Sequence, residues 1–239
     1  MSALATLSAD AAAGAASQLA ALRPSEYTAA LIQVLRARAA AVRGRRALEI
    51  GSGSGVVLAA LGGLGAAGLC GVDIEGTAVA AGALLLHRLG YGDRLEMHRG
   101  DMWQPLAGRR FDLVAANLPQ FPMDALPYGG RLPSWSSGGA DGRRLLDRLL
   151  NGLAAHLAPG GRAVLTHNAF IDLELTREIV ARDGLSLRIA MSVLVNLGDE
   201  KLDLMSRQIL IAEEGRSIQR YGPYALAEMH VVEIGADLG

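Results

Sequence analysis

The chain has 239 residues, 51% of them hydrophobic, which is enough for one large α/β domain with a sizeable core. Its net charge of −1 and pI near 6.5 give no overall attraction for nucleic acid, so a nucleic-acid partner is not expected. Cys70 is the single cysteine, which excludes an intramolecular disulfide and indicates a reducing cytoplasm. No charged residue lies between Ile50 and Val72, but the many glycines there argue against a membrane span.

The N-terminal part of the chain, residues 1–45, is predicted to be helical. Residues 1–22 are rich in Ala, and Arg23-Pro24-Ser25-Glu26-Tyr27-Thr28 interrupts them. Apolar residues then recur at helical spacing from Leu31 to Leu35, and Gly44 is a suitable end for the helix. Helix capping beside Pro24 would explain Glu26 and Tyr27; a ligand-binding role for the two residues is the alternative.

A glycine-rich turn follows the first predicted strand, Ala47–Ile50. It reads Gly51-Ser52-Gly53-Ser54-Gly55, and the apolar run that starts at Val56 can form a helix. Such a turn lets the backbone approach a ligand at the carboxyl end of a sheet. Dinucleotide-binding turns read G-x-G-x-x-G, whereas here the third glycine comes one residue early and Glu49 precedes the first. At this point the alternative that the turn binds no ligand stays open.

Asp73 closes the second predicted strand, residues 68–74, and lies 22 positions beyond Gly51. A carboxylate about 20 residues past a glycine-rich turn is placed to bind the ribose hydroxyls of a nucleotide cofactor. Glu75 is a weaker alternative for this role. Asp73 therefore supports a nucleotide-type cofactor without identifying it.

The remaining segments alternate between predicted strands and helices. The predicted strands are 94–99, 111–116 and 162–167; the predicted helices are 76–89, 145–157 and 172–182; and the predicted final hairpin joins 185–197 to 206–212. Residues 121–142 form a long loop of the kind that often carries function. This order predicts an open, doubly wound, mostly parallel seven-stranded sheet with a C-terminal antiparallel hairpin.

Two motifs resemble those of known methyltransferases. Glu49 and the glycines after it resemble motif I of class I S-adenosylmethionine-dependent methyltransferases, and Asn117-Leu118-Pro119-Gln120 resembles the N-P-P-Y signature of amino-methyltransferases. The segments 23–26, 121–124, 138–142 and 159–161 resemble conserved stretches of the HemK/PrmC-type glutamine N-methyltransferases. The resemblance covers about residues 23–213, which makes a dehydrogenase a distant alternative.

The resemblance implies roles for the matching residues. The Asn117 side-chain oxygen and the Leu118 carbonyl would accept hydrogen bonds from a planar NH₂ group, with Pro119 fixing the backbone. An Asp at position 101 would meet the adenine amino group and the Met102 backbone would contact the ring. The implied cofactor-binding residues are Glu49, Gly51, Ser52, Gly53, Gly55, Asp73, Ile74, Asp101, Met102 and Asn117. The candidate substrate-binding residues are Glu26, Tyr27, Tyr128, Trp135 and His167.

The chain departs from the family pattern in three ways. Gln120 replaces the aromatic residue that stacks on the acceptor, so its amide is expected to bind polar groups of the substrate instead. Leu118 replaces the first proline. Only about 25 residues precede the matched region, so the substrate-gripping N-terminal domain of release-factor methyltransferases is expected to be lacking.

These observations predict a cytoplasmic bacterial enzyme with a helical cap (1–45), a cofactor domain (46–216) and a C-terminal extension (217–239). The extension is expected to add an edge strand, with an acceptor-lining role as the alternative. The expected reaction is N-methylation of a planar amino or amide group on a small molecule or short peptide. A protein-glutamine or nucleic-acid methyltransferase, and a catalytically silent cofactor-binding subunit, stay open. The histidines show no metal-ligand spacing, so no metal is expected.

Overall fold

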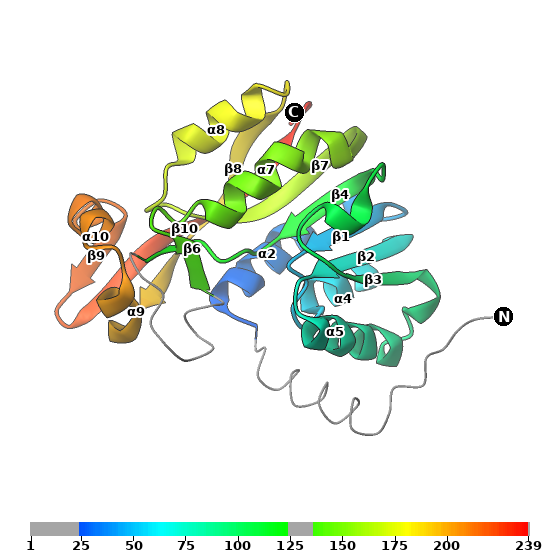
Figure 1. The fold of residues 1–239 in the computed structure, drawn as a ribbon, viewed down its shortest axis with the longest axis horizontal. Helices are drawn as coiled ribbons and strands as arrows, with labels where there is room; N and C mark the ends of the chain where they lie inside the picture. The colour runs from blue at the N-terminus through cyan, green and yellow to red at the C-terminus, as the bar shows by residue number, and fades with distance from the viewer. Residues whose placement is uncertain (1–23, 124–135, 239) are drawn as a thin grey trace.

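The computed structural model describes residues 24–123 and 136–238 (Figure 1). The described chain opens with α2 (Glu26–Ala37) and α3 (Ala39–Val42). The Ser25 side chain caps α2 by accepting the Thr28 N–H, and the apolar residues Leu31, Val34 and Leu35 bury its inner face. The helix predicted before Gly44 is therefore confirmed, whereas residues 1–22 lie outside the described part.

A mostly parallel sheet forms the centre of the protein, with strand order β3-β2-β1-β4-β7-β10-β8 and β9 paired to β10. The strands are β1 (Arg46–Ile50), β2 (Gly68–Asp73), β3 (Leu95–Arg99), β4 (Phe111–Ala116), β7 (Leu157–Asn168), β8 (Ser186–Leu197), β9 (Ile218–Tyr221) and β10 (Tyr224–Gly235). The pairs among β3, β2, β1, β4 and β7 are parallel, and β10 is antiparallel to β7 and β8. The predicted doubly wound sheet is confirmed, and β9 adds a strand beyond the seven expected.

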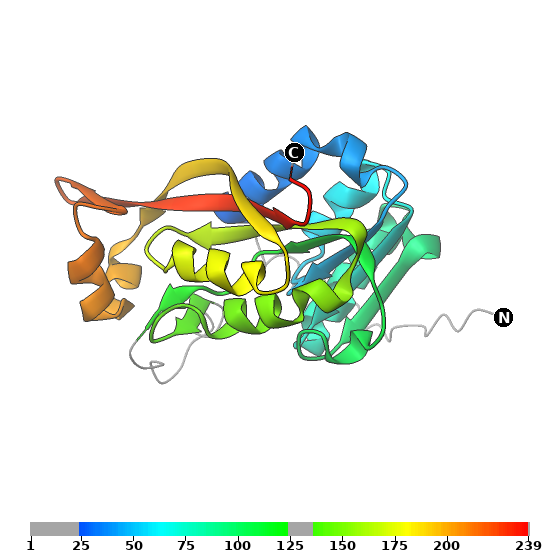
Figure 2. The same cartoon turned by 90° about the horizontal axis from the view of Figure 1, so that it is seen from above.

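Helices cover both faces of the sheet, and their amphipathic or apolar sequences pack against it. They are α4 (Val56–Gly63), α5 (Gly76–Arg88), α7 (Arg144–His156) and α8 (Leu173–Ala181). Figure 2 shows α7 and α8 on one face, with α2 on the other, where it contacts α4. The strand interiors between these layers are fully buried, as at Leu48 and Val114. Among the helices of the described residues, none is long and apolar enough to cross a bilayer.

The partner of β8 differs from the one predicted. Residues 206–212 belong to α10 (Arg207–Glu213), which follows α9 (Asp199–Leu204), and β8 pairs instead with β10. Short apolar runs with Ile fit a strand or a helix equally well, and here Ser206 starts a helix. Residues 217–239 add the expected edge strand as β9, which among the described strands pairs only with β10, but β10 itself lies inside the sheet between β7 and β8. The hairpin of β9 and β10, with α9 and α10, extends from one end of the molecule (Figures 1 and 2).

A buried carboxylate ties three elements together on the α2 side of this sheet. The Glu233 side chain of β10 is fully buried and accepts hydrogen bonds from Arg38, at the end of α2, and from Arg188 of β8. Burial alone would raise the pKa of Glu233, but the two guanidinium groups outweigh it and hold that pKa below its usual value. The ion pairs therefore anchor α2 to the antiparallel half of the sheet.

Candidate active site

The glycine-rich turn between β1 and α4 has a left-handed backbone at each glycine. The φ angles of Gly51, Gly53 and Gly55 are 72°, 48° and 77°. A Cβ atom on Gly51 would lie 2.8 Å from the Leu118 side chain, and one on Gly55 would lie 2.9 Å from the Gly82 backbone. A Cβ on Gly53 would meet nothing within 4 Å. Gly51 and Gly55 thus allow close packing, while Gly53 borders open space that a ligand could fill.

Asp73 organises this turn from the end of β2. Its carboxylate accepts the N–H of Gly53 at 2.8 Å and the N–H of Glu75 at 2.9 Å. Burial raises the pKa of Asp73 above its usual value, although these bonds act in the opposite direction. A carboxylate offers about four acceptor sites, so the two bonds leave capacity for ribose hydroxyls.

Two buried polar groups beside the turn have incomplete partners. Glu49 accepts the Leu58 N–H at 3.2 Å, and burial raises its pKa well above the usual range. No basic residue of the described chain pairs with it within ion-pair distance. The Ser52 hydroxyl is buried without a hydrogen-bond partner among the described residues. Both groups fit a ligand that brings positive charge and hydrogen-bonding groups to the turn.

Asn117 follows β4 and is held from two sides. Its Oδ1 accepts a hydrogen bond from the Thr166 hydroxyl of β7 at 2.8 Å, and its Nδ2 donates to the Thr28 hydroxyl of α2 at 3.3 Å. These bonds orient the Asn117 amide before any ligand binds. The oxygen keeps a second lone pair for an incoming N–H group.

Asn117 and the glycine-rich turn line one cleft of about 410 Å³. The start of α2, the turn, the segment after β4 and single residues from later in the chain form its wall. The lining residues are Pro24, Ser25, Glu26, Tyr27, Thr28, Glu49, Gly51, Ser52, Gly53, Ser54, Val56, Val57, Asn117, Leu118, Pro119, Gln120, Phe121, Ser136, Asn168 and Lys201. The two predicted motifs thus meet in one site, large enough for a drug-sized ligand.

Gln120 makes backbone hydrogen bonds that the sequence did not predict. Its side chain is buried; Nε2 donates to the Thr166 carbonyl at 2.7 Å, and Oε1 accepts the Asn168 N–H at 3.1 Å. The amide therefore fastens the segment after β4 to the end of β7, and its principal partners are backbone groups rather than a substrate. Gln120 also lines the cleft, so contact between its amide and the acceptor stays a prediction.

The segment after β3 forms a separate hollow next to the end of β2. Asp101, Met102, Trp103, Gln104 and Arg148 line it, and the Gly100 N–H donates to the Asp73 carbonyl. Met102 is the one non-glycine residue of the described chain with a positive φ, at 51°. Asp101 binds Arg148 at 2.6 Å, so part of its carboxylate is already engaged.

The apolar side chain of Ile74 is exposed at 64%, as required of a residue that could cover an adenine ring. It directly follows Asp73 at the end of β2. Position and exposure therefore keep Ile74 and the hollow after β3 as candidates for the nucleoside end of a cofactor.

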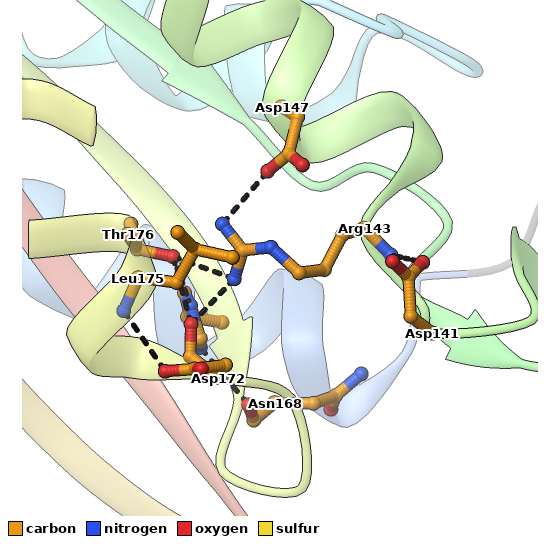
Figure 3. Close-up of polar contacts among 8 residues, drawn as sticks. Asp141, Arg143, Asp147, Asn168, Asp172, Leu175 and Thr176 are labelled. Carbon is orange, nitrogen blue, oxygen red and sulfur yellow. Dashed lines mark hydrogen bonds and ion pairs between the residues drawn. The ribbon is translucent and has the colours of Figure 1, made fainter. Parts of the chain in front are cut away.

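His167 is misplaced among the predicted substrate-binding residues. Its ring is buried away from the cleft, where Nε2 lies 2.9 Å from the Thr176 hydroxyl of α8. Arg143 binds the same hydroxyl, the Asp147 carboxylate and the Asp172 carbonyl (Figure 3). Burial, with the nearby Arg143 charge, lowers the pKa of His167 to about 4. The alternating side chains of β7 explain this placement, because Thr166 faces Asn117 and His167 faces α8.

The other predicted substrate-binding residues divide by position. Glu26 and Tyr27 line the cleft, whereas Tyr128 and Trp135 lie outside the described residues. Thr28, Thr166, Asn168 and Lys201 were not predicted. The strand alternation at the end of β7 could have indicated Thr166, but no sequence signal marks Lys201, because it comes from α9, far along the chain.

Comparison with solved structures defines the fold class. The chain matches the ribosomal protein L11 methylase of Lactobacillus delbrueckii with a TM-score of 0.53, at 17% identity, over 87% of this chain and 79% of that one. It matches the rRNA methyltransferase RsmC of Thermus thermophilus, solved with AdoMet and guanosine, with a TM-score of 0.51 at 18% identity, over 87% and 43%. The fold is that of the class I methyltransferases.

Sequence comparison confirms the resemblance to the glutamine methyltransferases. The chain is 30% identical to the release factor glutamine methyltransferase of Gloeobacter violaceus, over 59% of this chain and 51% of that protein. It is 36% identical to the ribosomal protein uL3 glutamine methyltransferase of Bradyrhizobium diazoefficiens (38% and 30%) and 31% identical to the ribosomal RNA small subunit methyltransferase C of Chromohalobacter salexigens (60% and 38%). The matches thus span about half or less of these relatives. No family model matches the chain.

Proposed function

We propose that this protein is an S-adenosylmethionine-dependent methyltransferase that methylates the nitrogen of a planar amino or amide group. The observation that carries the proposal is the Asn117 amide, fixed by Thr28 and Thr166 in the same cleft as the glycine-rich turn. The sequence relatives are named as methyltransferases of glutamine side chains or of rRNA, which supports this chemistry.

The donor set of the site fits this cofactor. Asp73 would hold the ribose hydroxyls, and the hollow at Met102, with Ile74, would take the adenine. The uncompensated Glu49 carboxyl and the unpartnered Ser52 hydroxyl would face the charged amino-acid end. When bound, the cofactor supplies an electrophilic methyl group on a cationic sulfur.

The chain's own residues would act on the acceptor by positioning it. The Asn117 oxygen and the Leu118 carbonyl accept the two N–H bonds of a planar amine, which turns its lone pair toward the cofactor side of the cleft. Such alignment of two reactants can contribute roughly 7–11 kcal/mol to a reaction. Nothing in this scheme requires a nucleophilic side chain.

The preferred acceptor is a small molecule or short peptide that enters the cleft. A protein glutamine or an rRNA base is the second candidate, because the relatives named above act on ribosomal protein, release factor or rRNA.

The single cysteine is buried, and we infer a cytoplasmic location from the absence of any disulfide it could form within the chain.

Calorimetry followed by an acceptor screen tests the proposal. Wild-type protein should bind S-adenosylhomocysteine and not NAD, and should transfer a labelled methyl group to at least one amine- or amide-bearing acceptor. Tight NAD binding would assign the chain to the dehydrogenases. Binding of the cofactor without transfer to small, peptide, protein or RNA acceptors would favour a silent cofactor-binding subunit.

A further inference from the structure

Among the described residues that line the cleft, α9 contributes Lys201, and the unit of α9 and α10 is bonded to the chain that follows the Asn117 segment. The Ser206 N–H, at the start of α10, donates to the Pro122 carbonyl at 2.8 Å. This bond joins the α9–α10 unit to the chain directly after Gln120 and Phe121. Lys201 of α9 therefore lines the cleft on the wall that continues from the acceptor motif.

Lys201 brings a positive charge to a cleft whose described lining also holds the carboxyl groups of Glu26 and Glu49. It is the single basic residue among the described residues that line the cleft, and no ion pair of the described chain includes it. Its Nζ lies 5.8 Å from the ring centroid of Tyr27, a distance suited to a cation–π contact. Burial raises the pKa of the Tyr27 phenol, so Lys201 meets the face of a neutral aromatic ring.

Asn168 lies on the same side and has an unused acceptor. Its backbone N–H is taken by Gln120, while its side-chain oxygen is buried without a partner among the described residues. In Figure 3 the Asn168 side chain extends away from the Arg143–Asp172 cluster. An unpaired buried acceptor is costly, so a ligand N–H or O–H at this point would be favoured.

We propose that Lys201, Tyr27 and Asn168 form an anion subsite of the acceptor pocket. This subsite would bind a carboxylate or phosphate of the acceptor that lies beside the planar nitrogen group. Lys201 supplies the positive charge, and the Asn168 side-chain oxygen accepts a hydrogen bond from a neighbouring N–H or O–H group of the acceptor. The subsite rests on the proposed function, because it assigns the substrate class of the same cleft. It makes the acceptor an anionic molecule or segment rather than a neutral one.

The attachment of the α9–α10 unit favours a role of Lys201 toward the acceptor over recognition of the cofactor's own carboxylate. The cofactor side of the cleft already holds Glu49 and the backbone of the glycine-rich turn at the start of α4. Lys201 stands instead on the element bonded to the segment after Asn117.

The experiment exploits the fact that Lys201 is the only lysine of the chain. Reductive methylation with ¹³C-formaldehyde labels it together with the terminal amine and keeps its charge. The Lys201→Arg protein identifies which signal is lost. Protein saturated with S-adenosylhomocysteine is then titrated with two matched probe pairs: N-acetylglutamine against N-acetylglutamine amide, and deoxyadenosine monophosphate against deoxyadenosine.

At least one anionic probe should shift the Lys201 signal and bind more tightly than its neutral partner, and the pair that responds tells carboxylate from phosphate. Lys201→Met should weaken that probe about tenfold or more, as expected for a charge-assisted hydrogen bond, while Lys201→Arg largely retains it. Arg207→Met, an exposed cation on α10, serves as the control and should change nothing.

Equal binding of charged and neutral probes, or no shift with any of them, would overturn the subsite. So would a tenfold loss of S-adenosylhomocysteine affinity in Lys201→Met, because Lys201 would then read the cofactor. The proposed function fails separately, through absent cofactor binding in the wild-type protein.

Discussion

Asn117 is oriented by two threonines that come from opposite sides of the site. Thr28 belongs to α2 and Thr166 to β7, so the geometry of one amide depends on packing between a helix and a strand far apart in sequence. Because these bonds already fix the Asn117 amide, the side chain has little rotational freedom left to lose when the acceptor binds. This is the arrangement expected where catalysis depends on alignment.

Asn117→Ala should therefore leave S-adenosylhomocysteine affinity nearly unchanged and lower turnover about 100-fold or more, roughly 2.7 kcal/mol of barrier. A joint fall of kcat and kcat/KM would mark an interaction made in the transition state. Asn151→Ala, at an exposed position of α7, is the matched control. Normal turnover by Asn117→Ala would place the acceptor elsewhere.

Gln120 supports the site through backbone groups. Gln120→Leu keeps a similar volume but leaves the buried Thr166 carbonyl and Asn168 N–H unpaired, so it should destabilise the protein by about 2–4 kcal/mol. Chemical denaturation measures the change, with the exposed Gln208→Leu as control. Unchanged stability together with altered acceptor selectivity would return Gln120 to a substrate-binding role.

At the scale of elements, the Glu233 ion pairs link α2, β8 and β10. Since α2 also carries Thr28 and Tyr27, the same ion pairs help to hold one wall of the cleft. The site therefore depends on a contact at the opposite end of α2, where Arg38 binds Glu233. Neither the glycine-rich turn nor the Asn117 motif contains information about it.

Glu233→Gln should lower the free energy of unfolding by about 2–3 kcal/mol at pH 7, less than the 3–5 kcal/mol typical of a fully buried pair, because both arginines can reach water. The pKa of Glu233 is lower in the folded state than in the unfolded chain. Its ion pairs therefore stabilise the protein at pH values above the unfolded-state pKa, and this stabilisation is lost as the pH falls through the folded-state pKa. Glu214→Gln, which breaks an exposed pair with Arg220, should change stability by less than about 0.5 kcal/mol.

At the scale of the whole molecule, buried histidine sets an acid limit on stability. The folded protein keeps His167 neutral, with a pKa of about 4, whereas the unfolded chain protonates it near 6.5. The unfolded state therefore binds more protons between these values, and stability falls as pH drops through this window. Besides burial, the nearby charges of Arg143 and His230 also lower the pKa of His167, whereas Asp172 acts in the opposite direction.

Urea denaturation from pH 7 to pH 4 should show a loss of roughly 3 kcal/mol from this histidine alone. His167→Gln should flatten the profile across that range, even if the variant is less stable at pH 7. His87→Gln, an exposed substitution on α5, should leave the profile unchanged. An unaltered slope in His167→Gln would show that other groups cause the acid sensitivity.

The parallel half of the fold could be predicted because each strand carries its own apolar run and ends in a marked turn. The same local signals mark Glu49, Gly53, Asp73 and Asn117 as candidate site residues, and the structure places each of them at or near the carboxyl end of a strand. The antiparallel half could not, since the residues around Ile209 and Ile211 fit either a strand or a helix. His167 was misjudged because its role depends on which face of β7 it occupies. The backbone partners of Gln120 depend on how the segment after β4 packs against β7, and the place of Lys201 depends on the docking of α9.

The interior position of β10 has a consequence for synthesis of the protein. β7 and β8 leave the ribosome before β10, yet each pairs with β10 and neither pairs with the other. Until β10 emerges, β7 keeps one unpaired edge and β8 has no partner among the described strands of this sheet, so both strands are open to pairing with another chain. The sheet is therefore completed only when β10 inserts between β7 and β8. The ion pair between Glu233 and Arg38 of α2 also forms only at that stage.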